Sequence, residues 1–398
     1  MEHIYRDDSV VFLPGRDPLR AKASYRVTHP IQLQLRESVD WLNANGLYPM
    51  ELSEELLQKI RSGCARVVNI NHPAAQRLIE RPWDIPSGKL RVHVLAMGDV
   101  GATLLLGLVL LGGDVISSIG ICDVREHVLR RYEYEMNQIS WPFEYDALPA
   151  VQTVPQEELF ECDVFVFCAS RAVPPVGVAV EDVRMAQLQG NASILKAYAK
   201  QAREAGFHGL FAVVSDPVDL LSQYAFLESN RNEAGVLDWR GLLPEQIRGY
   251  GLGVMNARAA YYAKRASRFA SFLTQGRAYG PHGKGLIIAN SVEAYDDALS
   301  LELTRLATEA NLRMREAGFK PYIAPALSSG AMSILLTVRR EWHYSAIFLD
   351  GVYFGCKNRQ SSMGIEAETL SLPSALHERI RQEHAMLWEQ GSQWRGMN

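Results

Sequence analysis

Short apolar runs alternate with segments of helical periodicity from about residue 89 onward. Four of these runs are rich in β-branched and aromatic residues, which predicts strands. They cover residues 91–95, 116–122, 163–167 and 210–214. Helices are expected after the first run, ending at Leu111, and over residues 191–205. This order is typical of βαβ units, so we expect a doubly wound parallel sheet of the Rossmann type over residues 89–245.

The first 88 residues precede this alternation and carry mainly helical signals. Ser53 is a typical N-cap, and Gly63 suits the end of the same helix. Further helices are expected over residues 30–45 and from Pro73. Because no motif is evident there, we interpret residues 1–88 as a helical extension that serves packing or contacts between subunits.

A new segment begins near Ile247. Helices are expected after Asn256 and over residues 291–317 and 376–389. We interpret residues 246–398 as an α+β domain that supplies the substrate-binding and catalytic residues.

The composition argues against several classes of protein. Apolar residues make up 47% and charged residues 22% of the 398-residue chain, as in ordinary globular proteins. A net charge of −4 gives no reason to expect nucleic acid, and the longest apolar run, residues 102–113, is too short to cross a membrane. The five cysteines are scattered, so we expect reduced thiols in the cytoplasm, with neither disulfides nor a metal site.

A glycine-containing loop follows the first predicted strand and opens a helix. Its sequence is Gly98-Asp99-Val100-Gly101. Glycines at such a turn allow the backbone to approach a pyrophosphate, whose charge then lies at the helix N-terminus. Ala96 replaces the first glycine of the usual G-x-G-x-x-G pattern, so the loop alone is a weak signal for dinucleotide binding.

Asp123 ends the second predicted strand and strengthens the signal. An acid at this point accepts hydrogen bonds from a ribose 2′-hydroxyl and repels a 2′-phosphate, which favours NAD over NADP. Arg125 lies two residues further on and keeps NADP open as an alternative. A doubly wound domain that binds no dinucleotide is the other alternative.

Four further segments carry a family resemblance. They are residues 213–219 (V-V-S-D-P-V-D), 249–258 (G-Y-G-L-G-V-M-N-A-R), 280–283 (G-P-H-G) and 191–194 (N-A-S-I). They resemble the V-V-S-N-P-V-D, G-x-G-x-x-L-D-S-A-R, G-E-H-G and N-A-x-I segments of lactate and malate dehydrogenases, and the interval between Arg258 and His282 is similar too. The chain is therefore identified as a divergent member of the lactate/malate dehydrogenase superfamily with an N-terminal extension.

The resemblance implies hydride transfer between NAD and a small 2-hydroxy or 2-oxo acid. Arg258 matches the arginine that binds the substrate carboxylate, where a planar guanidinium makes a two-point contact. His282 matches the histidine that exchanges the hydroxyl proton. The resemblance also implies a homodimer or homotetramer.

Other family positions have a less definite register. Arg184 stands where the family carries an arginine that polarises the substrate carbonyl. Arg171 stands where malate dehydrogenases have a second substrate-binding arginine and other members contact the cofactor. The interval between them is longer than usual, which leaves open whether either is an ordinary solvated side chain. Ser328, or Ser329 beside it, corresponds to the residue that hydrogen-bonds the cofactor carboxamide.

Two positions depart from the family pattern. The aspartate that hydrogen-bonds the catalytic histidine falls on Met255, whose thioether cannot accept that bond with useful strength or stabilise an imidazolium. The asparagine of the S-N-P segment is Asp216. One explanation is that Asp216 supplies the carboxylate that Met255 lacks. The other is decay of the activity or a change of reaction.

Three functions therefore remain open. The first is an NAD-dependent oxidoreductase that acts on a small carboxylate substrate, with His282, Arg258, Arg184 and Asp216 as catalytic residues. The second is an NAD-binding protein without dehydrogenase activity. The third is an NAD-dependent glycosidase of a related family, whose chemistry needs a metal held by cysteine and histidine; no such pair is evident in the sequence.

Overall fold

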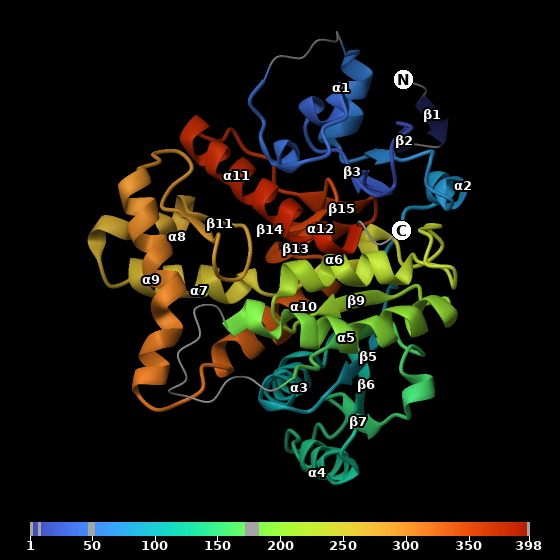
Figure 1. Ribbon diagram of the computed structural model, residues 1–398, viewed down its shortest axis with the longest axis vertical. Coiled ribbons are helices and arrows are strands. Elements are labelled where there is room, and N and C mark those ends of the chain that lie inside the picture. Colours follow the sequence, from blue (N-terminus) through green and yellow to red (C-terminus); the bar gives the residue numbers. More distant parts are fainter. Residues whose placement is uncertain (1–2, 7–8, 47–51, 172–182, 396–398) are drawn as a thin grey trace.

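A computed structural model describes residues 3–6, 9–46, 52–171 and 183–395 (Figure 1). Six parallel strands form one half of its main sheet. In spatial order they are β7 (Ala150–Thr153), β6 (Ile116–Cys122), β5 (Leu90–Leu95), β8 (Val164–Phe167), β9 (Leu210–Val213) and β10 (Ile247–Gly249). The winding direction reverses between β5 and β8, and in such sheets ligands bind at the carboxyl ends of the strands at this point. The predicted doubly wound α/β fold is confirmed.

Both faces of the parallel strands are buried, which explains their nearly continuous apolar sequences. In β8, Phe165 belongs to the same apolar cluster as residues of α5 (Val183–Glu204) and α6 (Val218–Ser229). Its neighbour Val164 belongs to the cluster on the other face, with residues of α3 (Asp99–Leu111) and α10 (Met332–Val338). Helices thus cover both sides of the sheet and leave the carboxyl ends of its strands to form a site.

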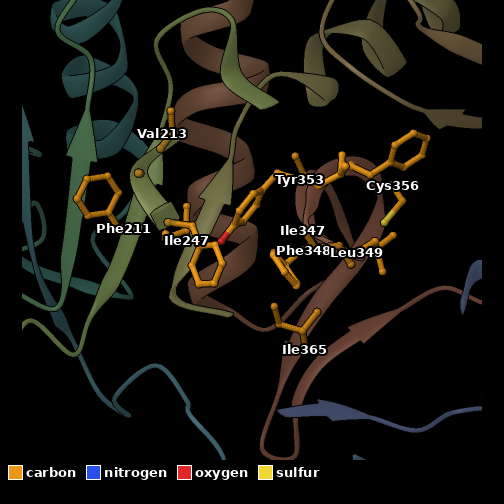
Figure 2. Packing of buried hydrophobic residues seen from close by; sticks show 14 of the residues in the cluster. Phe211, Val213, Ile247, Ile347, Phe348, Leu349, Tyr353, Cys356 and Ile365 are labelled. Atoms are coloured by element: carbon orange, nitrogen blue, oxygen red, sulfur yellow. The ribbon is translucent and has the colours of Figure 1, made fainter. Parts of the chain in front are cut away.

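The other half of the sheet is largely antiparallel. Strand β10 pairs with β13 (His343–Leu349) through Gly249 and Ala346, and β14 (Val352–Ser361) and β15 (Gly364–Ala367) follow in order. Figure 2 shows buried side chains of β9, β10, β13, β14 and β15 in one cluster. This continuous core joins the parallel strands to the C-terminal region.

The N-terminal segment extends the same sheet. Its strands are β3 (Ser24–Arg26), β4 (Ala65–Val68), β2 (Ser9–Phe12) and β1 (His3–Arg6), and β3 pairs with β15. They lie at the opposite end of the molecule from β7 and α4 (Glu126–Met136) (Figure 1). The predicted helical character of residues 1–88 is therefore wrong in part, because strands of three or four residues are too short to show a period of two.

The helices of this segment agree only partly with the prediction. Helix α1 (Glu54–Arg61) begins after Ser53, whose side chain accepts a hydrogen bond from the backbone of Leu56, as expected of an N-cap. Helix α2 (Ala75–Glu80) follows Pro73. The single helix predicted over residues 30–45 is wrong: two 3-10 helices, Pro30–Gln34 and Val39–Leu42, are separated by Leu35, whose φ of 59° cannot continue a helix.

The rest of the C-terminal region packs around these strands. Its elements are α7 (Leu252–Ala263), α8 (Phe272–Gln275), the hairpin β11 (Arg277–Tyr279) and β12 (Ile287–Ala289), α9 (Asp297–Glu316), α11 (Ser374–Gln390) and α12 (Ser392–Arg395). Helix α7 starts earlier than predicted, and α9 starts later, where Asp296 caps it through the backbone N–H of Leu299. Within the described residues, none of the helices combines the length and the apolar character that a membrane crossing requires.

Candidate active site

The loop between β5 and α3 has the close packing that a dinucleotide site requires. Ala96 adopts a left-handed conformation with φ of 76°. A Cβ atom at Gly101 would lie 2.0 Å from the carbonyl oxygen of Ala96, so only glycine is accommodated there. A Cβ atom at Gly98 would meet nothing within 4 Å, so there is space beside the loop.

The first turn of α3 can hold an anion. Gly98 is its N-cap and supplies no side chain to the backbone N–H groups, which leaves them for a ligand phosphate. Val100 packs against the apolar cluster under the sheet. Asp99 faces outward and pairs with Lys320, whose Nζ lies 2.9 Å from a carboxylate oxygen. The glycine loop and the first turn of α3 therefore fit a dinucleotide, and the Asp99 side chain points away toward Lys320.

Asp123 lies at the end of β6, with a side chain that is only 4% exposed. Its carboxylate accepts hydrogen bonds from the backbone N–H of Met97 (2.7 Å) and from the guanidinium of Arg125 (2.9 and 3.0 Å). Burial alone would raise the pKa of Asp123, but the bonds from Arg125 and Met97 outweigh it and lower the pKa below its ordinary value. The carboxylate is thus ionised and already paired with Arg125, the residue for which NADP had been kept as an alternative cofactor.

His282 and Asp216 lie together, although 66 positions separate them in the sequence. Nδ1 of His282 is 3.0 Å from Oδ1 of Asp216, and the histidine side chain is 6% exposed. An ionised carboxylate can only accept a hydrogen bond, so Nδ1 carries the proton of this bond. In the neutral imidazole, Nε2 is then the nitrogen that can take up a proton.

The loop that carries His282 is held by two residues whose roles the sequence did not reveal. The backbone N–H of His282 donates to Asp219 at 3.1 Å, and Asp219 is itself buried. A Cβ atom at Gly251 would lie 2.5 Å from Cβ of His282, so the glycine before α7 makes room for the histidine. Both residues belong to the segments that carry the family resemblance, which is the one signal that could have found them.

Asn191 connects the ends of β8 and β9. Its Nδ2 donates to the carbonyl of Asp216 at 2.7 Å, and its Oδ1 accepts from the backbone N–H of Arg171 at 2.8 Å. Arg171 is therefore fixed at the edge of the site with an exposed side chain. The backbone of Arg184 lies in the first turn of α5, but its side chain is outside the part of the chain that the structure describes.

Arg258 projects from α7, the helix that begins beside His282. Its side chain is half-buried, and one guanidinium nitrogen lies 3.5 Å from the sulfur of Met255. Met255 itself is fully buried. The structure thus places a methionine on the buried side of α7 next to the arginine.

Ser328 and Ser329 lie in the π-helical turn Pro325–Ala331. The Ser329 hydroxyl donates to the carbonyl of Gly251 (2.7 Å) and accepts from the backbone N–H of Val254 (2.8 Å), so it fixes the start of α7. The carbonyl of Ser328 accepts a bond from the hydroxyl of Ser333. Contact of Ser328 with a cofactor carboxamide stays a prediction.

Metal ligands do not cluster in the described part of the chain. No group of three or more histidine, cysteine, aspartate or glutamate side chains is arranged there to hold an ion. The site is therefore described by its glycine loop, its acids and its histidine.

Comparison with known proteins adds independent findings. Residues 90–238 match the family model of the NAD-binding domain of lactate/malate dehydrogenase. A malate dehydrogenase of Sulfurimonas denitrificans is 23% identical over 278 residues, which are 66% of this chain and 80% of that protein. An L-lactate dehydrogenase of Mycoplasma genitalium is 29% identical over 102 residues, 26% of this chain and 29% of that protein.

Solved structures share the fold. Malate dehydrogenase from Cryptosporidium parvum superimposes with a TM-score of 0.60 at 15% identity, covering 78% of this chain and 100% of that chain. Malate dehydrogenase from Archaeoglobus fulgidus in complex with NADH gives a TM-score of 0.59 at 18% identity, covering 76% and 99%. At these identities the likeness is one of fold.

The doubly wound sheet, the glycine loop and the acid that ends β6 define the class of NAD-dependent dehydrogenases. Within this class, residues 90–238 match the NAD-binding domain of lactate/malate dehydrogenases, which supports membership of that superfamily and NAD as the cofactor. The family and the cofactor predicted from the sequence are thereby confirmed.

Proposed function

We propose that the protein transfers a hydride between NAD and a small 2-hydroxy or 2-oxo acid. The observation that carries this proposal is the hydrogen bond between His282 and Asp216. It gives the histidine a carboxylate partner at Nδ1. The methionine at position 255 had put the presence of such a partner in doubt. The carboxylate of Asp216 can stabilise an imidazolium as its proton arrives.

Each residue then has a defined task. Arg258 fixes the substrate carboxylate by a two-point contact. His282 takes the hydroxyl proton at Nε2 and returns it in the reverse reaction, while Asp216 stabilises the protonated ring. NAD, held by the glycine loop and Asp123, would supply the acceptor for the hydride that leaves the substrate carbon.

Three further positions complete the proposed site. Arg184 polarises the substrate carbonyl, and Arg171 contributes a second positive charge at the edge of the pocket. Ser328 contacts the carboxamide. The glycine loop with Asp99 and Val100 and the acid Asp123 bind the rest of the cofactor, in accordance with the space beside Gly98.

The direct test is oxidation of NADH by the purified protein with a panel of 2-oxo acids of increasing size and charge. We expect turnover with at least one of them. If NADH binds and none is reduced, the second function applies, that of an NAD-binding protein without dehydrogenase activity. Met255 is the specific observation that favours this second candidate.

The position of Asp123 leads to a prediction about the cofactor. NAD(H) should bind more tightly than NADP(H), and Asp123→Ser should reduce that preference because the repulsion of a 2′-phosphate is lost. Arg125→Ala is the complementary variant: it removes the cation that pairs with Asp123 and should weaken NADP(H) binding further. Titration of both cofactors checks this, and NADP(H) binding equally well to the unmodified protein would refute it.

We also propose that the protein is a homodimer or homotetramer. Helix α3 exposes Leu106, Leu110 and Leu111 on its outer side, and burial of such side chains against a second copy would stabilise an assembly. Light scattering at micromolar concentration should give at least twice the mass of the chain, and Leu110→Glu should shift it toward the monomer. A monomeric unmodified protein would contradict the proposal.

Two broader assignments belong with this function. We propose boundaries near residues 88 and 245, which separate the N-terminal segment, the NAD-binding domain and the region that carries Arg258 and His282. We propose the cytoplasm as the location, because all five cysteines are free thiols, as expected in a reducing compartment.

A further inference from the structure

A cavity of about 450 Å³ lies at the end of β9 opposite to the candidate active site. The N-terminal segment, the C-terminal end of α5 and the loops before β9 and β10 form its walls. The residues important here are His72, Arg77, Arg203, His208, Trp239 and Arg240. Its lining therefore comes from segments far apart in the sequence.

The lining is strongly biased toward positive charge. It includes three arginines, and no aspartate or glutamate is among the residues that line it. The nearby carboxylate of Asp238 is engaged by Arg203 through two bonds of 2.7 Å. The other two arginines, Arg77 and Arg240, are exposed. Such a lining suits an anion.

His72 is a buried residue of this lining. It is 3% exposed, and its Nδ1 accepts a hydrogen bond from the backbone N–H of Ala74 at 3.1 Å. Burial, together with the charge of Arg77, lowers the pKa of His72 to about 4, so the ring is neutral and its proton is on Nε2. Among the described residues Nε2 has no hydrogen-bond partner, which is uncommon for a buried polar group.

Trp239 forms an apolar wall in an unusual conformation. Its φ of 58° is rare for a bulky residue and is typical of functional sites. The ring stacks on Phe226 with centroids 5.7 Å apart. Asp238 holds the adjoining loop through Arg203 and the backbone N–H of Arg240. The wall is thus fixed in place next to the arginines.

We propose that this cavity binds a small organic molecule that carries a phosphate group. Guanidinium groups match phosphate oxygens in geometry and charge. The volume is that of a small-molecule site and exceeds the needs of a bare phosphate, and Trp239 offers a surface for the organic part. The cavity is separate from the cofactor loop, which lies at the carboxyl ends of the strands.

The test uses the protein saturated with NADH, so that the cofactor site is closed to the probes. Ribose 5-phosphate and inorganic phosphate are titrated by calorimetry, with ribose as the uncharged control. We expect ribose 5-phosphate to bind most tightly, inorganic phosphate more weakly and ribose not at all. Arg77→Ala and Arg240→Ala should each weaken ribose 5-phosphate by about tenfold to a hundredfold, as is typical for loss of a charged hydrogen bond.

Two variants separate binding from folding. Arg77→Gln keeps a long polar side chain at an exposed position but removes its charge, so it should weaken the phosphate while leaving the unfolding temperature and NADH affinity unchanged. Arg81→Ala removes an exposed arginine that does not line the cavity and should leave ribose 5-phosphate affinity unchanged. The proposal is overturned if neither phosphate probe binds at millimolar concentration, or if the cavity variants bind as tightly as Arg81→Ala.

Discussion

Arg258→Lys is expected to lower kcat/KM for every 2-oxo acid that the protein reduces by about tenfold to a hundredfold, the equivalent of about 1.5–3 kcal/mol for a hydrogen bond to a charged group. The positive charge is kept, but an ammonium cannot reproduce the planar two-point contact of a guanidinium with a carboxylate. The half-buried position of Arg258 limits the water that could take over the lost bond. Steady-state kinetics with each active substrate measures the effect.

The same variant should leave NADH affinity unchanged, because Arg258 belongs to α7 and the glycine loop belongs to the turn before α3. Arg265→Lys is the matched control, since Arg265 is exposed just beyond α7 and its guanidinium lies on the ring of Tyr261. We expect it to have no effect on turnover. Unchanged kcat/KM in Arg258→Lys would show that another residue holds the carboxylate.

The sequence predicted four of the parallel strands and missed a short strand beside them. Strands β5, β6, β8 and β9 are apolar runs buried on both faces, and all four were expected within about one residue. By contrast, β10 has three residues and includes the charged Arg248. That side chain is fully buried and bonded to Asn358 and Gln360, an environment that only the folded chain reveals.

The sequence predicted those residues of the candidate site that lie in recognisable motifs. The order of the segments pointed to His282 and Asp216, and the structure brings these two side chains together. The contact of His282 with Asp219 and its packing against Gly251 were not foreseen, because each joins segments that become neighbours only through folding. The pairing of Asp123 with Arg125 was also missed. Asp123 was expected to disfavour NADP and Arg125 to allow it, and the structure shows that the two side chains bind each other.

Asp216→Asn is expected to cut turnover by about two or more orders of magnitude, judged by the loss seen when the acid behind a catalytic histidine becomes an amide. Asn can still meet Nδ1 of His282, but it carries no charge to stabilise the protonated ring, and its amide can favour the wrong tautomer. Reduction of a 2-oxo acid needs the protonated imidazole, so activity falls as the pH rises through the pKa of His282. Without the carboxylate this pKa is lower, so the fall should begin at a lower pH than in the unmodified protein. A merely structural role of Asp216 would not move this pH profile.

Met255→Asp in the Asp216→Asn background should recover part of the lost turnover, because it returns an acid to the position where the family carries one. Met255 lies one helical turn after Gly251, the residue packed against His282, so the new carboxylate starts on the side of α7 that faces the histidine. Full recovery is not expected, since Arg258 lies beside Met255 and competes for the acid. Unfolding temperature and NADH affinity serve as controls for both variants. If Asp216→Asn turns over substrate as fast as the unmodified protein or faster, Asp216 has not replaced the missing acid.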